Sequence, residues 1–329
     1  MTIFENNQFN EALKQELLKG YPERDELYFE YTESFEKSGL LKMRIDRDID
    51  EYKNFDRFIY YCDLLALYSI YRGAYSSVVL DDFSQTKEMF AYASHYSYMA
   101  IHITSMLCYV DYDYTNEGKP FIDMFRISPL WGSVFIANDW NAIGKIGNDL
   151  IDSLNAKACI IKRGNRCAYI SWFMVKLYAL ATKKDINQRI VAYPIDGFDL
   201  YEEVLKKWNT IDVNELDKII SMLCELHTLQ PEHRFFPSDG GEYFEQPYLQ
   251  IFPYEALVLL KLRKKNGIFN PDSFSHALMQ TSLMTELLKS DEIMGLSSLP
   301  PYSKTLLKYL EAAYPKLQSF EGYKTKISL

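Results

Sequence analysis

The sequence predicts an all-α fold, a multi-helix bundle of helical hairpins resembling an irregular α-solenoid, with no significant sheet. Three observations lead to this prediction. Apolar residues recur at helical spacing along most of the 329 residues, and no stretch alternates apolar and polar residues for long. The 14 Gly and 12 Pro are also few for a sandwich, a barrel or a Gly-rich nucleotide-binding fold. Residues 78–80 and 158–162 resemble strands but are too short to carry a sheet.

The clearest helix is predicted between residues 52 and 70. Its apolar residues recur at steps of three and four positions, so they share one continuous face that we expect to lie in the core. Gly73 is expected to end this helix, and two shorter helices are expected before it, at 7–19 and 26–37. The core face consists of Tyr52, Phe55, Ile59, Cys62, Ala66 and Ile70.

The next helix is expected to start at Asp81 or Asp82 and to run to about Tyr109, followed by a polar loop at 111–120. The apolar stretch 121–137 contains Pro129 and Gly132. It is therefore predicted to be a loop with short helical turns that seals one edge of the core.

The C-terminal half is predicted to contain further helices, separated by capping residues and helix breakers. Asp139 and Asp212 are expected to cap two of them, and Gly267 is expected to stop another. The segment 230–248 is rich in Pro and Gly, and we expect an ordered loop there. The predicted helices are 139–154, 168–182, 198–208, 213–229, 252–265, 272–288 and 303–314.

The chain divides into an N-terminal helical part, 1–110, a loop-rich connector, 111–138, and a C-terminal helical part, 139–329. No linker rich in Gly and Ser separates them. We therefore expect the parts to share one core and to pack as one compact unit.

Charge and cysteine content restrict the partners and the compartment. The 36 Lys and Arg against 45 Asp and Glu give a net charge of −9, which repels phosphate backbones and disfavours a nucleic-acid partner. The five cysteines are odd in number and form no C-x-x-C pair, which indicates a reducing compartment. The start of the chain does not resemble a signal peptide, and no apolar run approaches the roughly 18 residues that would span a bilayer. These features predict a cytoplasmic protein without a membrane partner.

Histidines are the first candidates for chemistry. His95 and His102 lie on one helix face roughly 10 Å apart along the axis, too far to chelate one metal ion alone. A buried, hydrogen-bonded aromatic cluster is the favoured interpretation, and a metal-dependent hydrolase built around this pair is the alternative. His227 and His233 bracket Pro231, where a helix-end histidine and an exposed loop histidine explain the pattern as well as an active-site loop does. We assign no catalytic, cofactor-binding or metal-ligating residue and expect no cofactor.

Tyrosines beside carboxylates are the candidates for binding. Such pairs combine a large, rigid contact area with charge, which suits the recognition of another protein. They occur in two predicted loops, 111–120 and 230–248. The predicted partner-binding residues are Asp111, Tyr112, Asp113 and Glu117 in the first loop and Glu242, Tyr243 and Glu245 in the second.

One segment resembles a known family. Residues 250–268 pass from an aromatic-rich turn into the helix Glu255-Ala256-Leu257 and end at Gly267, and Ser275-His276-Ala277-Leu278-Met279 follows as a short motif. This pattern resembles the late helix of bacterial all-helical immunity proteins, in particular the immunity protein 49 family. The polymorphic-nuclease immunity (PoNi) proteins are similar, but Lys264-Lys265-Asn266 stands where their acidic doublet is expected.

The resemblance covers residues 250–279, and more loosely the Tyr-rich stretch 55–72, and it carries over no functional residue. It implies a non-enzymatic antitoxin that binds a cognate protein toxin, occludes its active site and so takes part in interbacterial competition. A cytoplasmic antitoxin would act against a toxin that works in the cytoplasm, such as a nuclease. The surface of that toxin would be basic, which suits the acidic charge of this chain. A helical scaffold protein with another basic partner is a further alternative, and a homodimer is compatible with the sequence.

Overall fold

The computed structural model describes residues 14–15, 55–110, 124–155, 166–187, 198–229, 249, 251–296 and 298–313. Regular secondary structure in these ranges is entirely helical, which confirms the predicted all-α fold there. Of the first predicted helix only residues 14 and 15 are described, and both are helical. The elements are α5 (Phe55–Val78), α6 (Phe83–Val110), α7 (Met124–Ile136), α8 (Trp140–Asn155), α9 (Arg166–Thr182), α10 (Asp199–Lys206), α11 (Val213–Leu229), α13 (Tyr254–Lys265), the 3-10 helix η4 (Ala277–Gln280), α14 (Ser282–Lys289) and α15 (Ser303–Ala313).

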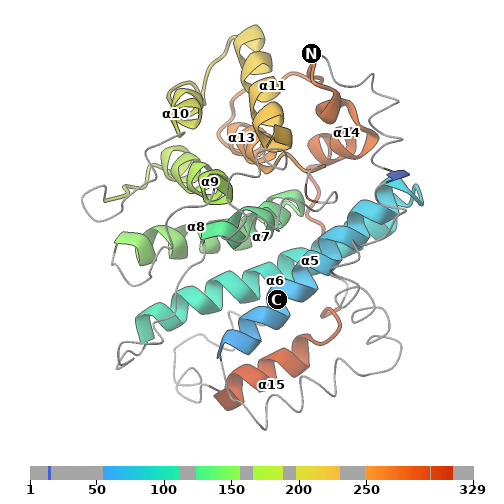
Figure 1. Ribbon diagram of the computed structural model, residues 1–329, viewed down its shortest axis with the longest axis vertical. Coiled ribbons are helices and arrows are strands. Elements are labelled where there is room, and N and C mark those ends of the chain that lie inside the picture. Colours follow the sequence, from blue (N-terminus) through green and yellow to red (C-terminus); the bar gives the residue numbers. More distant parts are fainter. Residues whose placement is uncertain are drawn as a thin grey trace.

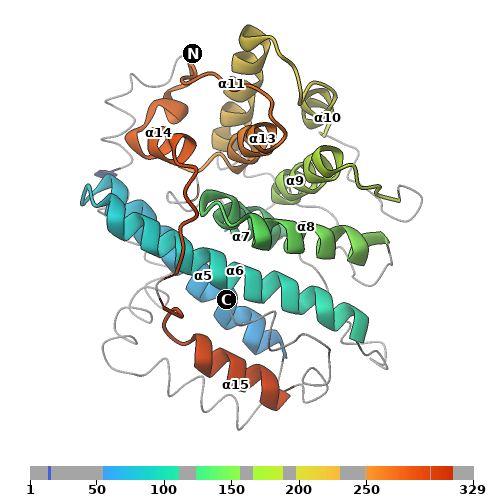
Figure 2. The same cartoon turned by 180° about the vertical axis from the view of Figure 1, so that it is seen from behind.

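The helices stack in successive layers around a long central hairpin. Helices α5 and α6 form this hairpin, with α15 on one side of it and α7 and α8 on the other (Figure 1). Helix α9 covers α7, and α13 packs against both α7 and α9. Helices α10, α11 and α14 lie at the far end of the molecule from α15, as the view from behind also shows (Figure 2). None of the helices in the described ranges is both long and apolar enough to cross a membrane.

Helix α5 is buried on more than the predicted face. Cys62, Ala66 and Ile70 are buried and Ile59 is partly buried, as expected, whereas Tyr52 and the side chain of Phe55 lie outside the described residues. Phe58 and Leu65, which widen the predicted face on one side, are buried as well, and so are Tyr61 and Leu67, which lie off it. The reason is that three helices, α6, α7 and α15, pack against α5.

Gly73 does not end α5, which corrects one prediction. The helix continues to Val78, and a Cβ atom at Gly73 would lie 3.0 Å from the ring of Phe90 on α6. The glycine therefore allows a close approach of two helices. The turn between them comes later, where Asp81 has a φ of 54° and Asp82 Oδ1 accepts a hydrogen bond from the amide of Gln85 at 2.9 Å.

The stretch 121–137 was expected to be a loop, and that prediction is wrong for residues 124–136. They form α7, with Pro129 inside the helix. A proline there costs about 3 kcal/mol, but Trp131, Val134 and Phe135 are fully buried, and burying each contributes roughly 1.5–3 kcal/mol. Tertiary packing thus outweighs the local preference. Gly132 also serves this packing, because a Cβ atom there would lie 2.2 Å from the ring of Tyr254.

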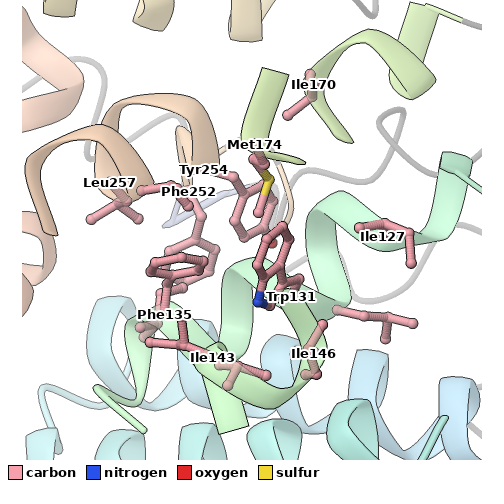
Figure 3. Close-up of a cluster of buried hydrophobic side chains, with 14 of the residues drawn as sticks. Ile127, Trp131, Phe135, Ile143, Ile146, Ile170, Met174, Phe252, Tyr254 and Leu257 are labelled. Carbon is pink, nitrogen blue, oxygen red and sulfur yellow. The ribbon is translucent and has the colours of Figure 1, made fainter. Parts of the chain in front are cut away.

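An aromatic cluster around Trp131 joins α7 to the neighbouring helices (Figure 3). The ring of Trp131 lies 5.4 Å from those of Phe135 and Tyr178, measured between centroids, and the pair with Tyr178 is edge-to-face. Residues of α8, α9 and α13 complete the cluster, so one core connects these four helices: Ile143, Ile146, Ile170, Met174, Tyr254 and Leu257.

The remaining helices follow the predictions closely, with one exception. Asp139 caps α8, because its Oδ1 accepts a hydrogen bond from the amide of Ala142, and Asp212 caps α11 in the same way through Asn214, both at 2.9 Å. The predicted helix 272–288 begins later than expected. His276 caps η4 and Thr281 caps α14, and each of these side chains accepts a backbone hydrogen bond, which divides the segment into two short helices.

Candidate protein-binding site

His95 and His102 are both buried in α6, and among the described residues neither belongs to a group of three or more possible metal ligands. Nδ1 of His102 is hydrogen-bonded to Asp149 of α8, and its ring stacks on Tyr98 with 4.8 Å between centroids. His95 lies edge-on to Tyr96, and its ring nitrogens have no hydrogen-bond partner in the described ranges. Burial lowers the pKa of His95 to about 4, so its ring is neutral near pH 7. The favoured aromatic cluster is therefore present, but only one of its two histidines is hydrogen-bonded.

The described part of the chain holds no group of three or more His, Cys, Asp or Glu residues placed to bind a metal ion. Cys62 and Cys224 are buried free cysteines. Burial raises the pKa of both thiols, with Asp63 adding to the shift at Cys62 and Glu255 at Cys224. Both thiols are protonated at neutral pH, which disfavours a nucleophilic role.

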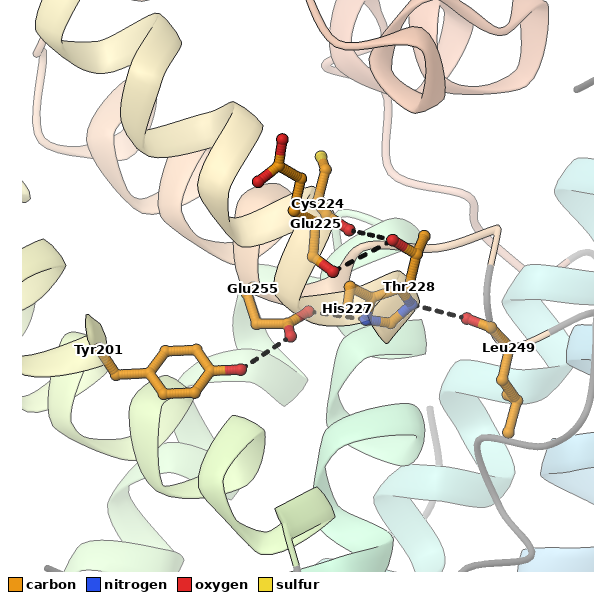
Figure 4. A network of polar contacts seen from close by, with 7 residues as sticks. All are labelled: Tyr201, Cys224, Glu225, His227, Thr228, Leu249 and Glu255. Carbon is orange, nitrogen blue, oxygen red and sulfur yellow. Dashed lines mark hydrogen bonds and ion pairs between the residues drawn. The ribbon is translucent and has the colours of Figure 1, made fainter. Parts of the chain in front are cut away.

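A buried polar network links α10, α11 and α13 (Figure 4). Nδ1 of His227 on α11 lies 2.9 Å from Oε2 of Glu255 on α13, and the hydroxyl of Tyr201 on α10 donates to Oε1 of Glu255 over 3.2 Å. Nε2 of His227 lies 3.1 Å from the carbonyl oxygen of Leu249. Each ring nitrogen and each carboxylate oxygen thus has a partner.

Full burial decides what this network can do. The side chains of His227 and Glu255 have no exposed surface, so a substrate from solvent does not reach them in this conformation. A charged group in such a place is costly unless it is paired and hydrogen-bonded, and here it is. The network therefore acts as a polar link that sets the relative positions of three helices.

Arg263, at the opposite end of α13, extends this framework to the surface. Its buried guanidinium donates to the carbonyl oxygens of Trp208 at 2.7 Å and Thr210 at 2.9 Å, which belong to the loop between α10 and α11. It also donates to the carbonyl oxygen of Phe269 at 2.8 Å and to Oδ1 of Asn270 at 2.9 Å, in the loop after α13. We call residues 207–212 and 266–271 together the Arg263 loops.

The geometry of the second loop is also held locally. Gly267 has a φ of 71°, in the left-handed region, and the amide of Ile268 donates to the carbonyl oxygen of Arg263 at 2.9 Å. Nδ2 of Asn270 donates to the carbonyl oxygen of Leu260 at 2.8 Å. Gly267 thus occupies the stop position that the sequence predicts for α13.

The Arg263 loops hold apolar side chains in solvent. Ile211 is 89% exposed, Phe269 is 68% exposed, and Val213, which follows the first loop, is 43% exposed. Nη2 of Arg263 binds the carbonyl oxygens of both Thr210 and Phe269, so the two loops lie side by side. Two loops that Arg263 holds together thus expose apolar side chains, and we take them as the candidate binding site.

The partner-binding residues predicted from the sequence lie outside the described residues, as does His233: Asp111, Tyr112, Asp113, Glu117, Glu242, Tyr243 and Glu245. Sequence reasoning missed Ile211 and Phe269 because the sequence of a short loop does not show which of its apolar residues point into solvent: Ile268 is partly buried, whereas Phe269 beside it is exposed. It also missed the pairing of His227 with Glu255. The available signal was one acidic residue inside the otherwise apolar run that starts α13.

The comparisons with known proteins leave the family open. No protein-family model, curated protein or solved structure matches the chain. The likeness of residues 250–279 to immunity proteins stays a prediction from those residues. Glu255, Ala256 and Leu257, which contribute most to that likeness, are all buried, so they describe packing within α13.

Proposed function

We propose that the protein is an immunity protein that binds a cognate, cytoplasm-acting toxin, such as a nuclease, and occludes its active site. The observation that carries the proposal is the pair of loops held by Arg263, which exposes Ile211 and Phe269 on a fixed base. Apolar side chains on a preformed surface favour protein binding, because little conformational entropy is lost when the partner docks. The net charge of −9 suits a partner that carries the Lys and Arg used to hold phosphates.

Co-expression tests this function directly. Proteins encoded beside the gene are produced in a sensitive host, each with and without this chain. We expect one of them to be toxic alone and harmless in the presence of the chain. The purified pair should then form a complex of fixed stoichiometry in light scattering, with association that slows as salt is added.

The same preparation addresses the competing enzyme class. A stoichiometric transition metal in the purified chain, retained after dialysis, would favour the hydrolase built around His95 and His102. Toxicity that persists at equal expression of both proteins, for every neighbour tested, would contradict the immunity function.

A further inference from the structure

The side chains that flank the Arg263 loops indicate what kind of partner they fit. Four lysines lie in these loops or within two residues of them in sequence, and each already has a contact in the structure. Lys206 pairs with Glu203 at 2.7 Å, Lys207 pairs with Glu215 at 2.9 Å and Lys264 pairs with Asp291. The ammonium of Lys265 lies 5.0 Å from the ring centroid of Trp140. The cations beside the loops are thus engaged within the protein.

Two exposed carboxylates lie near the apolar residues in sequence and, unlike three of these lysines, have no ion-pair partner within the described ranges. Asp212 directly follows Ile211, and Asp272 lies three positions after Phe269. Oδ1 of Asp212 accepts hydrogen bonds from the amides of Asn214 and Glu215 and so caps α11. Its other oxygen, Oδ2, has no partner among the residues that the structure describes. Both carboxylates are placed to receive a cation from outside.

We propose that the Arg263 loops are the contact surface for a basic protein, with Ile211 and Phe269 as apolar anchors and Asp212 and Asp272 as the groups that pair with its Lys or Arg. The inference rests on the proposed function for the biological identity of the partner, a toxin. The chemistry of the surface itself stands on the loops alone.

Other occupants fit this surface less well. A second copy would carry the same net charge of −9, so its docking on this surface would cost energy through like-charge repulsion. A membrane with anionic headgroups would be repelled by Asp212 and Asp272 for the same reason. A protein with a basic, partly apolar surface meets both kinds of side chain.

Two double variants of the full chain test the inference. Ile211→Ser with Phe269→Ser removes the anchors at exposed positions. Asp212→Asn with Asp272→Asn removes the charges, and Asn retains the capping function of Asp212. Matched controls make the same changes elsewhere: Leu80→Ser, in the turn between α5 and α6, and Asp152→Asn, on α8, both at exposed positions.

The first probe is the toxin found by co-expression. We expect each double variant to bind it at least about tenfold more weakly, while the controls bind as the wild type does. The anchor variant should mainly dissociate faster, and the charge variant should associate more slowly with a weaker dependence on salt. If both double variants neutralise the toxin and bind it with unchanged affinity, the Arg263 loops are not the contact surface. The proposed immunity function would then still hold.

The second probe does not depend on a toxin. It is a Lys- and Arg-rich peptide carrying one Trp, compared with the same peptide with Glu in place of the basic residues. Hydrogen exchange of the full chain should show protection at 207–213 and 266–272 with the basic peptide only. Protection elsewhere, or none, would overturn the inference. So would a dimer in light scattering that the anchor variant converts to a monomer, because the surface would then bind a second copy.

Discussion

Nδ1 of His227 lies 2.9 Å from Oε2 of Glu255, and both side chains are completely buried. The two residues come from α11 and α13, and the second carboxylate oxygen of Glu255 accepts a hydrogen bond from Tyr201 of α10. One acidic side chain therefore joins three helices. The same helix α13 carries Arg263, so the position of the exposed loops depends on how firmly α13 is held.

Removing this carboxylate should destabilise the fold. Glu255→Ala leaves the buried imidazole of His227 and the hydroxyl of Tyr201 without their acceptor, and we expect a loss of about 3 kcal/mol in the free energy of unfolding. Glu255→Gln keeps the shape and one acceptor oxygen and should lose less. Urea denaturation followed by circular dichroism measures both, with the exposed Glu225→Ala as control. Equal stability of Glu255→Ala and the wild type would show that the network contributes nothing.

His95 should make the fold sensitive to acid. Its pKa is lowered to about 4 in the folded state by burial, against about 6.5 in the unfolded chain. Above pH 6.5 both states hold a neutral ring. As the pH falls from 6.5 toward 4, only the unfolded state takes up the proton, so stability decreases by about 1.4 kcal/mol per pH unit.

The variant His95→Met isolates this contribution. Its stability relative to the wild type should rise by about 2 kcal/mol when the pH is lowered from 7 to 5, because the other titrating groups cancel in the difference. Chemical denaturation at both pH values gives the comparison. A difference that does not change with pH would mean that His95 titrates normally.

Two glycines of α8 should respond in opposite ways to alanine. A Cβ atom at Gly147 would lie 2.4 Å from the ring of Tyr178, whereas at Gly144 the nearest atom is the Tyr178 hydroxyl, 3.9 Å away. Gly147→Ala should therefore cost about 1–3 kcal/mol through overpacking. Gly144→Ala should gain up to about 1 kcal/mol, because alanine favours the helix. Thermal unfolding measures the stability of the two variants. Higher stability in both would mean that the ring of Tyr178 does not lie against Gly147.

Arg263→Lys should loosen the Arg263 loops. A lysine keeps the positive charge but not the planar set of donors that reaches the carbonyl oxygens of Trp208, Thr210 and Phe269. We expect about 2 kcal/mol of lost stability and faster hydrogen exchange at 207–212 and 266–271. Lys264→Ala, which removes a surface ion pair, should change stability by less than about 1 kcal/mol. Unchanged exchange in Arg263→Lys would show that the loops are held by their own turns.

The sequence predicted the features that depend on neighbouring residues. The caps at Asp139 and Asp212, the stop at Gly267 and the burial of Cys62, Ala66 and Ile70 follow the expectations, because each depends on residues a few positions away or on the helical period. The all-α fold follows from the same short-range preferences.

The tertiary structure decided what depends on distant partners. Gly73 lies inside α5 because Phe90 packs against it, and α7 includes Pro129 because the burial of its aromatic side chains outweighs the lost hydrogen bond. His227 is hydrogen-bonded to Glu255, and Arg263 donates to the carbonyl oxygen of Thr210, and in both pairs the residues are far apart in the chain. Such contacts form only when the helices assemble, so a periodic pattern predicts the helices and not the side chains that hold them together.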